Sequence, residues 1–190
     1  MAAIAEMLQG PRSNLILSMK SADGMGELNQ RASGRLVLGW EEWVAMPDLG
    51  VPAIKAKIDT GAKTSALHAE KIEEYTSGAI SRVRFTIRPA PRRPDISVVC
   101  TAPIIDHRPV TSSNGITENR FVIETTIGIG GQAWQIEVSL SNRRDMTYRM
   151  LLGRQALKGG SVLIDPGASF VQPKLRYGLY TGSNSKRTSR

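Results

Sequence analysis

The stretch of sequence that decides the fold is Ala56-Lys57-Ile58-Asp59-Thr60-Gly61-Ala62. Its first three residues end the run Val51–Ile58. In this run Ile54, Ala56 and Ile58 alternate with lysines, as in a half-buried strand. We expect the strand to end at Asp59, and Gly61, which has no Cβ, to let backbone N–H groups approach the Asp59 carboxylate. Asp-Thr-Gly is also an ordinary turn sequence, so the triplet by itself fits either a β-turn or one half of a water-activating carboxylate pair.

The triplet occurs once in the 190 residues, and this count predicts the assembly. A carboxylate pair that activates water shares one proton between two aspartates, so a chain with one copy needs a second chain. We therefore predict a homodimer with a two-fold interface that brings both copies of Asp59 together. We expect the Thr60 hydroxyl to hold the loop, Gly61 to allow close packing across the axis, and the Ala62 backbone to donate a hydrogen bond to the carboxylate.

Other aspartates compete for the role of second carboxylate within the same chain. Asp165 follows the apolar run Val162–Ile164, but Pro166 stands where the hydroxyl residue would be and has no N–H donor. We therefore interpret this segment as a turn. Asp106 and Asp145 lack a supporting glycine, which leaves the homodimer as the preferred arrangement.

Composition limits the classes of protein to which the chain can belong. One cysteine, Cys100, excludes an intramolecular disulfide and favours a reducing, cytoplasmic compartment. No apolar run reaches the roughly 18 residues of a membrane helix, and the N-terminus lacks the pattern of a signal peptide. The net charge of +8 fits either a solvated basic surface or attraction to an acidic peptide, while the 5% aromatic content argues against nucleic-acid binding.

The pattern of the whole sequence predicts an all-β chain. Short apolar or alternating runs predict strands at 51–58, 65–69, 80–88, 96–105, 121–129 and 133–140. Helix is expected after Gly153, with residues 69–75 as a second short helix. Composition predicts a flexible tail over residues 1–35, the folded domain over 36–180, and a disordered basic tail over 181–190.

A second element, the apolar-apolar-glycine run Leu151-Leu152-Gly153, lies far downstream of the triplet. Together the two resemble the retropepsin pattern, in which such a run passes beneath the Asp-Thr-Gly loop and buttresses it. A closer resemblance, from about Gly39 to Gln172, is to the bacterial retropepsin-like aspartic peptidase family long labelled ATP-dependent zinc proteases. The blocks that carry it are Gly39–Val44, Ala56–Ala69, Arg108–Gly115, Glu118–Arg120 and Met150–Leu157.

The resemblance implies a retropepsin-like closed β-barrel with one short helix after the Leu-Leu-Gly element, and the activity of an aspartic endopeptidase. The roles that it implies are catalysis by Asp59, Thr60 and Gly61, and structural support from Leu152, Gly153 and Arg154, with Arg154 at the dimer interface or capping the helix. Members of the family occur beside or fused to ATP-grasp amino-acid ligases, which implies a functional link to such a ligase. The alternative is a non-catalytic peptide-binding or docking module that works with the ligase.

The segment Arg108–Arg120 is the candidate for a flap over the substrate. It contains an Asn-Gly pair typical of hairpin turns. Because peptide cleavage requires water to be excluded around the substrate, we expect the hairpin backbone and the residues at its tip to contact the substrate. The substrate-binding residues expected are Ala62, Ser112, Ser113, Asn114 and Gly115. An ordinary exposed hairpin fits the same tip residues equally well.

Metal and nucleotide cofactors find no support in the sequence, although the family label mentions zinc and ATP. There is no His-Glu-x-x-His helix, and the two histidines, His68 and His107, are far apart. Cys100 and His107 do not have the spacing of a structural zinc site. There is no glycine-rich phosphate loop ending in Lys-Ser or Lys-Thr. We therefore predict no cofactor, and expect His68 to pack or hydrogen-bond near the Asp59 loop.

Two lysines flank Asp59 and bear on its state of ionisation. Lys57 precedes it by two residues, and Lys63 follows the loop. A nearby lysine favours the ionised carboxylate, whereas the shared-proton pair needs one neutral member. If Lys63 points at Asp59, we expect the resting enzyme to be inactive until substrate or a partner displaces the lysine.

Overall fold

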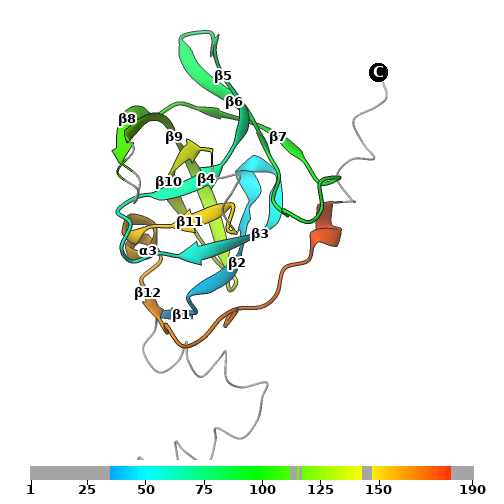
Figure 1. Ribbon diagram of the computed structural model, residues 1–190, viewed down its shortest axis with the longest axis vertical. Helices are drawn as coiled ribbons and strands as arrows, with labels where there is room; N and C mark the ends of the chain where they lie inside the picture. The colour runs from blue at the N-terminus through cyan, green and yellow to red at the C-terminus, as the bar shows by residue number, and fades with distance from the viewer. Residues whose placement is uncertain (1–34, 112–114, 116, 143–146, 181–190) are drawn as a thin grey trace, which may run out of the picture. The chain divides into compact units, whose positions relative to one another are not determined.

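Strands dominate the structure, a computed structural model that describes residues 35–111, 115, 117–142 and 147–180 (Figure 1). The strands are β1 (Leu36–Leu38), β2 (Glu41–Met46), β3 (Val51–Ile58), β4 (Ser65–His68), β5 (Glu70–Ser77), β6 (Ile80–Ile87), β7 (Val98–Pro103), β8 (Asp106–Thr111), β9 (Thr117–Ile129), β10 (Gln132–Ser141), β11 (Met150–Leu152) and β12 (Val162–Ile164). The helical elements are η4 (Pro47–Leu49), α3 (Arg154–Gly159) and η5 (Tyr177–Tyr180). The all-β class and the short helix after Gly153 are confirmed.

The tails predicted at 1–35 and 181–190 lie outside the described residues, apart from Arg35. The chain divides into two units, residues 1–35 and 36–190, and the strands and helices named above belong to the second. In the described part of that unit, no helix combines the length and the apolar character needed to cross a bilayer.

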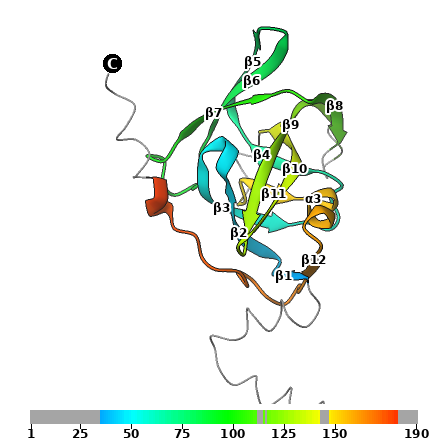
Figure 2. The same cartoon turned by 180° about the vertical axis from the view of Figure 1, so that it is seen from behind.

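The largest sheet has seven strands in the order β10-β4-β11-β3-β2-β9-β8. β9 pairs with β10 as well as with β2, so the pairings leave β10 through β4 and return to it through β9. The β9–β10 ladder is long, running from Ile129–Gln132 to Val122–Ser139, and Figure 2 shows the two strands side by side from behind. Between β2 and β9, one residue pair is in register, Ala45 with Gly128. The β2–β9 pairing is therefore the shortest of the strand pairings in this circuit.

Alternation along the strands sorts side chains between the core and the surface. Ile54, Ala56 and Ile58 of β3 are buried, as their spacing predicts. Val83, Phe85 and Ile87 of β6 are fully buried, which matches the alternation seen in that run. Burial of apolar side chains on one face is the main driving force that selects these strand registers.

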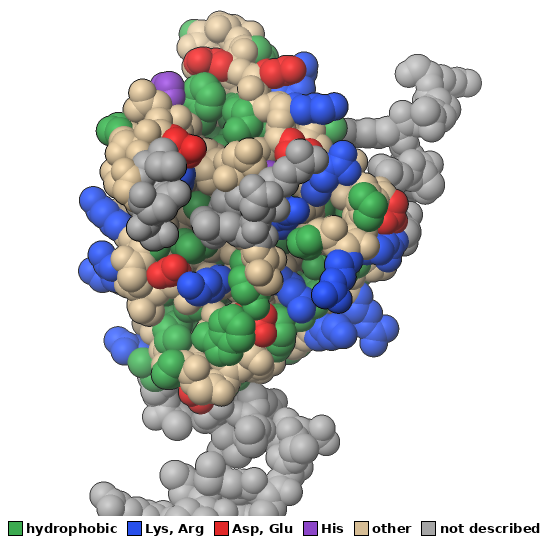
Figure 3. Space-filling model, in the orientation of Figure 1, with side chains coloured by type: hydrophobic (Ala, Val, Ile, Leu, Met, Phe, Trp, Pro, Cys, Tyr) green, Lys and Arg blue, Asp and Glu red, His purple; other side chains and the backbone are tan. Residues whose placement is uncertain are grey.

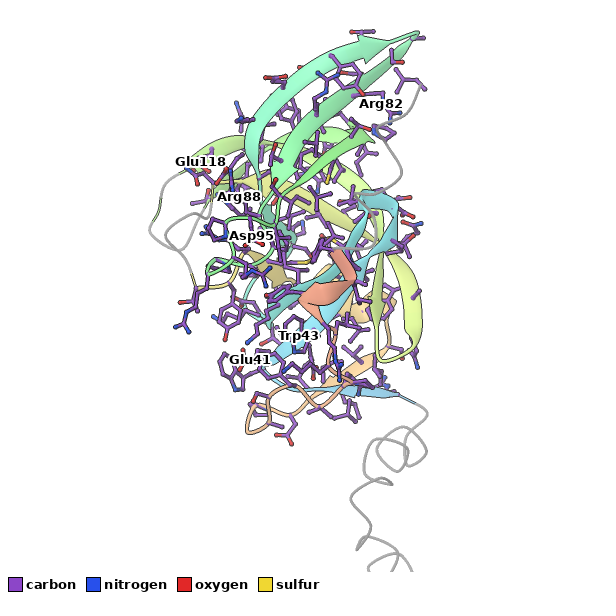
Figure 4. The ribbon with its side chains drawn as sticks, turned by 90° about the vertical axis from the view of Figure 1, so that its right-hand side faces the viewer. Glu41, Trp43, Arg82, Arg88, Asp95 and Glu118 are labelled. Atoms are coloured by element: carbon purple, nitrogen blue, oxygen red, sulfur yellow. The ribbon has the colours of Figure 1, made fainter. Side chains whose placement is uncertain are left out.

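A three-stranded sheet, β5-β6-β7, contains the one secondary-structure prediction that is wrong. Residues 69–75 were expected as a short helix, but β5 is a strand that pairs antiparallel with β6 from Glu70–Thr86 to Ser77–Ile80. Cross-strand partners supply the reason, since Ser81 donates to Glu74 across the hairpin. Figure 4 shows the hairpin curving away from the rest of the structure, with Arg82 towards its far end.

Residues 165–180, here called the strap, run from β12 past β2 to η5 and are drawn in orange to red in Figure 1. A fully buried carboxylate, that of Glu42, fastens the strap to β2. Its Oε1 accepts N–H bonds from Gly39 (2.8 Å) and Val171 (2.9 Å), and its Oε2 accepts one from Gln172 (3.2 Å). One donor, Gly39, precedes β2 in the sequence, and the other two, Val171 and Gln172, belong to the strap. The carboxylate therefore joins the strap to the turn before β2.

Aromatic contacts complete the attachment of the strap. The Trp43 ring, labelled in Figure 4, lies 6.0 Å from that of Phe170 and 5.2 Å from that of Tyr177. The Tyr180 hydroxyl donates to the Ala53 carbonyl oxygen in β3. The strap therefore covers the outer side of β2 and β3 with side chains that are mostly apolar.

The burial of Glu42 predicts how the free energy of unfolding changes with pH. Burial raises the pKa of its carboxyl above the ordinary value of 4.5, although the three N–H donors oppose the rise. The folded protein therefore binds this proton more tightly than the unfolded chain does. We expect the free energy of unfolding of the wild type, relative to Glu42→Gln, to rise as pH falls from above the raised pKa towards 4.5.

Urea unfolding of both proteins between pH 4.5 and 8 measures this difference. Subtracting the Glu42→Gln curve removes the titration of every other group. Two parallel curves would show that Glu42 titrates alike in the folded and unfolded states.

Candidate active site

Asp59 is positioned by a pairing between strands that are far apart in the sequence. β3 ends at Ile58, and β11 lies parallel to it with Leu152 in register with Ile58. The Asp59 N–H continues the ladder by donating to the Leu152 carbonyl oxygen at 2.9 Å. The Leu-Leu-Gly run thus supports the chain up to the residue that bears the carboxylate.

The loop after β3 directs its backbone donors at one oxygen of the Asp59 carboxylate. The N–H groups of Gly61 and Ala62 donate to Oδ1 at 3.0 and 3.1 Å. A Cβ at position 61 would lie 3.2 Å from the same Oδ1, which accounts for glycine at this position. The two N–H donors fix the orientation of the Asp59 side chain, which is 25% exposed.

Arg154 fastens the opposite side of the loop. Its Nη1 donates to the carbonyl oxygens of Thr60 and Gly61, each at 2.8 Å, and its backbone N–H donates to the Ala62 carbonyl oxygen at 2.9 Å. The guanidinium therefore holds the Asp-Thr-Gly loop of its own chain, and the dimer contact or helix cap expected of Arg154 stays a prediction. Thr60 enters this network through its carbonyl oxygen, and the part expected of its hydroxyl stays a prediction.

Gly153 passes so close to the chain after the loop that no side chain fits. An added Cβ would lie 2.5 Å from the carbonyl carbon and oxygen of Thr64, both of them backbone atoms. The Gly153 N–H donates to the Ser65 hydroxyl at 3.2 Å, and the Gln155 N–H donates to the Lys63 carbonyl oxygen at 3.1 Å. The beginning of α3 and the loop are therefore packed backbone against backbone.

Of the two lysines that flank Asp59, Lys57 is the one recorded beside the carboxylate. Its Nζ lies 3.7 Å from Oδ2, the oxygen that the backbone donors do not use. Lys63 is exposed, and the contact recorded for it is made by its backbone carbonyl oxygen. The lysine that lies beside the Asp59 carboxylate in this structure is therefore Lys57.

The hairpin proposed as a flap is formed by β8 and β9, and its base lies beside the loop. The two strands pair from Asp106–Val122 to Thr111–Thr117. A small pocket joins the hairpin to the chain after Asp59, and its lining is Thr64, Arg108, Val110, Val122, Glu137 and Ser139. At the tip, Gly115 is exposed with a left-handed φ of 80°, while Ser112, Ser113 and Asn114 lie outside the described residues. Substrate binding by the tip stays a prediction.

The competing aspartates have other partners. Asp165 accepts the Gly167 N–H at 2.9 Å and forms the turn that its proline predicts. Asp106 pairs with Arg108 on β8. Asp145 lies outside the described residues. Asp165 and Asp106, the two competitors that the structure describes, thus have other partners, and Asp59 is the candidate catalytic carboxylate.

The histidines and the cysteine do not converge on a site that fits zinc. His68 is buried beside Glu70, at the end of β4 away from the Asp59 loop, rather than near the loop as expected. His107 stacks on an aromatic ring, and burial raises the pKa of the Cys100 thiol to about 12. Across the described ranges, no three His, Cys, Asp or Glu residues are grouped to hold a metal ion. The predicted absence of a cofactor stays a prediction.

An aromatic pair beside the loop is a feature that the sequence does not reveal. Trp40 is 40% exposed, and its carbonyl oxygen accepts the N–H of Ile58, the last residue of β3, at 2.9 Å. The Tyr148 ring meets Trp40 edge-on, and its hydroxyl donates to Glu41. Burial and Glu41 raise the pKa of Tyr148 to about 12, so the phenol keeps its proton. No local pattern links these residues, because 107 positions separate Tyr148 from Glu41.

The structure combines a β-rich domain with one short helix and an Asp-Thr-Gly loop that an apolar-apolar-glycine run holds in place. This combination defines the class of retropepsin-like proteins. A family model described as "Retropepsin-like aspartic endopeptidase RimB" matches residues 37–175. The chain belongs to this RimB-like family. The resemblance drawn from the five sequence blocks is thereby confirmed.

Curated relatives include proteins named "Probable alpha-L-glutamate ligase". Those of Shewanella pealeana and Shewanella halifaxensis are 40% and 44% identical to the chain over 161 residues, which cover 81% of this chain and 35% of each relative. The chain thus spans about a third of the length of these relatives. A solved structure of a Legionella pneumophila protein of unknown function has a TM-score of 0.60 and 29% identity, and the match covers 70% of this chain and 95% of that one.

The contact at Gly153 predicts a loss of stability on adding one methyl group. In Gly153→Ala the new Cβ meets the Thr64 backbone, which cannot move without disturbing the loop. We expect a fall of about 1–3 kcal/mol in the free energy of unfolding. Gly178→Ala is the matched control, because an added Cβ there meets nothing within 4 Å. Equal stabilities for the two variants in urea would contradict the close packing.

Proposed function

We propose that the protein is an aspartic endopeptidase that works as a homodimer. The observation that carries the proposal is the Asp59 carboxylate at the end of a strand, held at Oδ1 by two N–H donors, with a side chain that is 25% exposed and whose Oδ2 lies 3.7 Å from Lys57. One such carboxylate is half of a water-activating pair, so the partner subunit supplies the other half through an isologous interface. The circuit of strand pairings corresponds in this proposal to the closed barrel of the fold.

The proposed mechanism divides two roles between the paired carboxylates. The two carboxylates, held close across the axis, share one proton. The ionised member removes a proton from a bound water while the protonated member polarises the scissile carbonyl. Water then adds to the carbonyl carbon to give a gem-diol. The carbon–nitrogen bond of the gem-diol breaks as the departing amine takes the proton that the carboxylate removed from water, and the pair is left with one shared proton. No covalent bond to the protein forms. Gly61 and Ala62 keep the carboxylate oriented, and the β8–β9 hairpin covers the substrate.

The substrate in this proposal is a peptide or protein with acidic residues. The net charge is +8, and Figure 3 shows lysine and arginine side chains spread over the face drawn rather than gathered in one patch. A dispersed positive charge attracts an acidic peptide without offering the stripe that a nucleic-acid backbone follows. The relatives named as glutamate ligases favour a functional link to an ATP-grasp ligase that adds acidic residues. We also propose a cytoplasmic location, since ligases of this kind use ATP.

A second candidate function is a non-catalytic module that docks peptides for the ligase. The observation in its favour is that the named ligases contain a region similar to this chain within a protein about three times as long. Such a module would bind acidic peptides and leave them intact. Turnover therefore separates the two candidates.

Substitution of Asp59 tests the catalytic role. We expect Asp59→Asn to lower peptide cleavage by at least about a hundredfold, because an amide cannot take part in the proton transfers. Asp165→Asn is the matched control, since Asp165 also follows a strand but only forms a turn. Cleavage of a peptide library by wild type, followed by mass spectrometry, is the measurement. Binding of acidic peptides without turnover by both wild type and Asp59→Asn would favour the docking module instead.

Dilution tests the homodimer. Specific activity should fall as the protein is diluted below its dimerisation constant, in step with the mass measured by analytical ultracentrifugation. A strictly monomeric preparation with full specific activity would rule out a shared site.

Chelation tests the proposed absence of a metal. Because the described His, Cys, Asp and Glu residues form no metal-binding group, we expect EDTA to leave cleavage unchanged. A zinc-dependent peptidase in the same buffer controls for effective chelation. A loss of activity that added zinc restores would contradict the carboxylate mechanism.

A further inference from the structure

Lys57 stands beside the Asp59 carboxylate with its ammonium open to solvent. It precedes Asp59 by two residues, so both side chains leave the strand on the same face. The Nζ–Oδ2 distance of 3.7 Å exceeds that of a hydrogen bond, and the Lys57 side chain is 47% exposed. An exposed ion pair at this distance contributes little to stability. Lys57 can therefore exchange Asp59 for another carboxylate at small cost.

The groups on either side of Lys57 leave its charge available. Glu41 stands opposite Lys57 in the β2–β3 register, but its carboxylate accepts the Tyr148 hydroxyl. Leu151, opposite Lys57 on β11, is apolar. Within the described residues, the ion pair recorded for Lys57 is the one with Asp59. The ammonium thus lies beside the oxygen of Asp59 that the backbone donors do not use.

Lys55, two residues earlier on the same face of β3, provides a contrast. Its Nζ lies 4.6 Å from the centre of the Phe170 ring and 5.4 Å from that of Trp43. These cation–π contacts hold Lys55 against the strap. No ring contact of this kind is recorded for Lys57 in the part of the chain that the structure describes. Of the two lysines of this strand, Lys55 is therefore held by aromatic rings, whereas Lys57 is more exposed and lies beside Asp59.

We propose that Lys57 determines specificity by binding the carboxylate side chain of the substrate residue next to the scissile bond. The inference rests on the proposed peptidase function. A substrate whose scissile carbonyl lies against Asp59 places the neighbouring side chain within reach of an ammonium 3.7 Å from that aspartate. A glutamate or aspartate side chain replaces Asp59 as the partner of Lys57, and a charge-assisted hydrogen bond to it favours acidic over neutral residues.

Two-fold symmetry extends this preference to both sides of the bond. An isologous dimer carries two copies of Lys57, one beside each Asp59. The two ammonium groups flank the scissile bond, so one meets the residue before it and the other the residue after it. The preferred bond therefore joins two acidic residues.

Internally quenched peptides that differ only at the two residues flanking the scissile bond test the proposal. Their flanking pairs are Glu-Glu, Gln-Gln and Lys-Lys, and mass spectrometry identifies the bond cleaved. We expect wild type to cleave the Glu-Glu peptide with the highest kcat/KM. Lys57→Met should reduce the ratio of Glu-Glu to Gln-Gln roughly tenfold or more, and Lys57→Glu should shift the preference towards Lys-Lys.

Lys55→Met is the control, because it removes the same charge from the same strand face and should leave the ratio unchanged. Circular dichroism and thermal unfolding check that all variants fold. If Lys57→Met lowers cleavage of the Glu-Glu and Gln-Gln peptides equally, Lys57 acts on Asp59 alone and the specificity role is wrong while the peptidase stands. If wild type cleaves no peptide at all, the proposed function fails, and the role of Lys57 fails with it.

Discussion

The parallel ladder between β3 and β11 is the constraint on which the rest of the site depends. It carries its last hydrogen bond from the Asp59 N–H to the Leu152 carbonyl oxygen, so the strand is rigid up to the catalytic candidate. Further contacts of the loop come from the chain that follows Leu152: Gly153 packs on Thr64, and Arg154 holds the loop carbonyls. Without this ladder, the backbone donors would have no fixed carboxylate to meet.

Local sequence was sufficient to predict the strands, turns and helices that depend on a few adjacent residues. The alternation before Asp59, the turn at Asp165 and the helix after Gly153 each follow from a few adjacent residues, and each is present. β5 was missed because its stability comes from pairing with β6, which no window around residues 69–75 contains. The same limit hid the contact of Tyr148 with Glu41 and the identity of the lysine beside Asp59, since side-chain direction depends on the packed structure.

Burial divides the charged residues of the structure into two groups with different uses. Glu42 is fully enclosed and satisfied by three backbone donors, so it joins the strap to β2 and is tied to structure. Lys57 is nearly half exposed and weakly paired, so it remains able to change partners. A buried charge without its donors is costly, whereas an exposed one loses little when its partner leaves. Specificity is therefore easier to place on Lys57 than on any enclosed charge.

Trp40 gives the protein an optical reporter of its own. Its indole is 40% exposed and touches Tyr148 beside the loop, whereas Trp43 is buried under the strap and Trp134 donates its indole N–H to the α3 carbonyl of Ala156. Emission from Trp40 therefore responds to whatever covers this indole, while Trp43 is already shielded. A second subunit or a peptide that covers Trp40 becomes visible as a blue shift in intrinsic fluorescence, with no label attached.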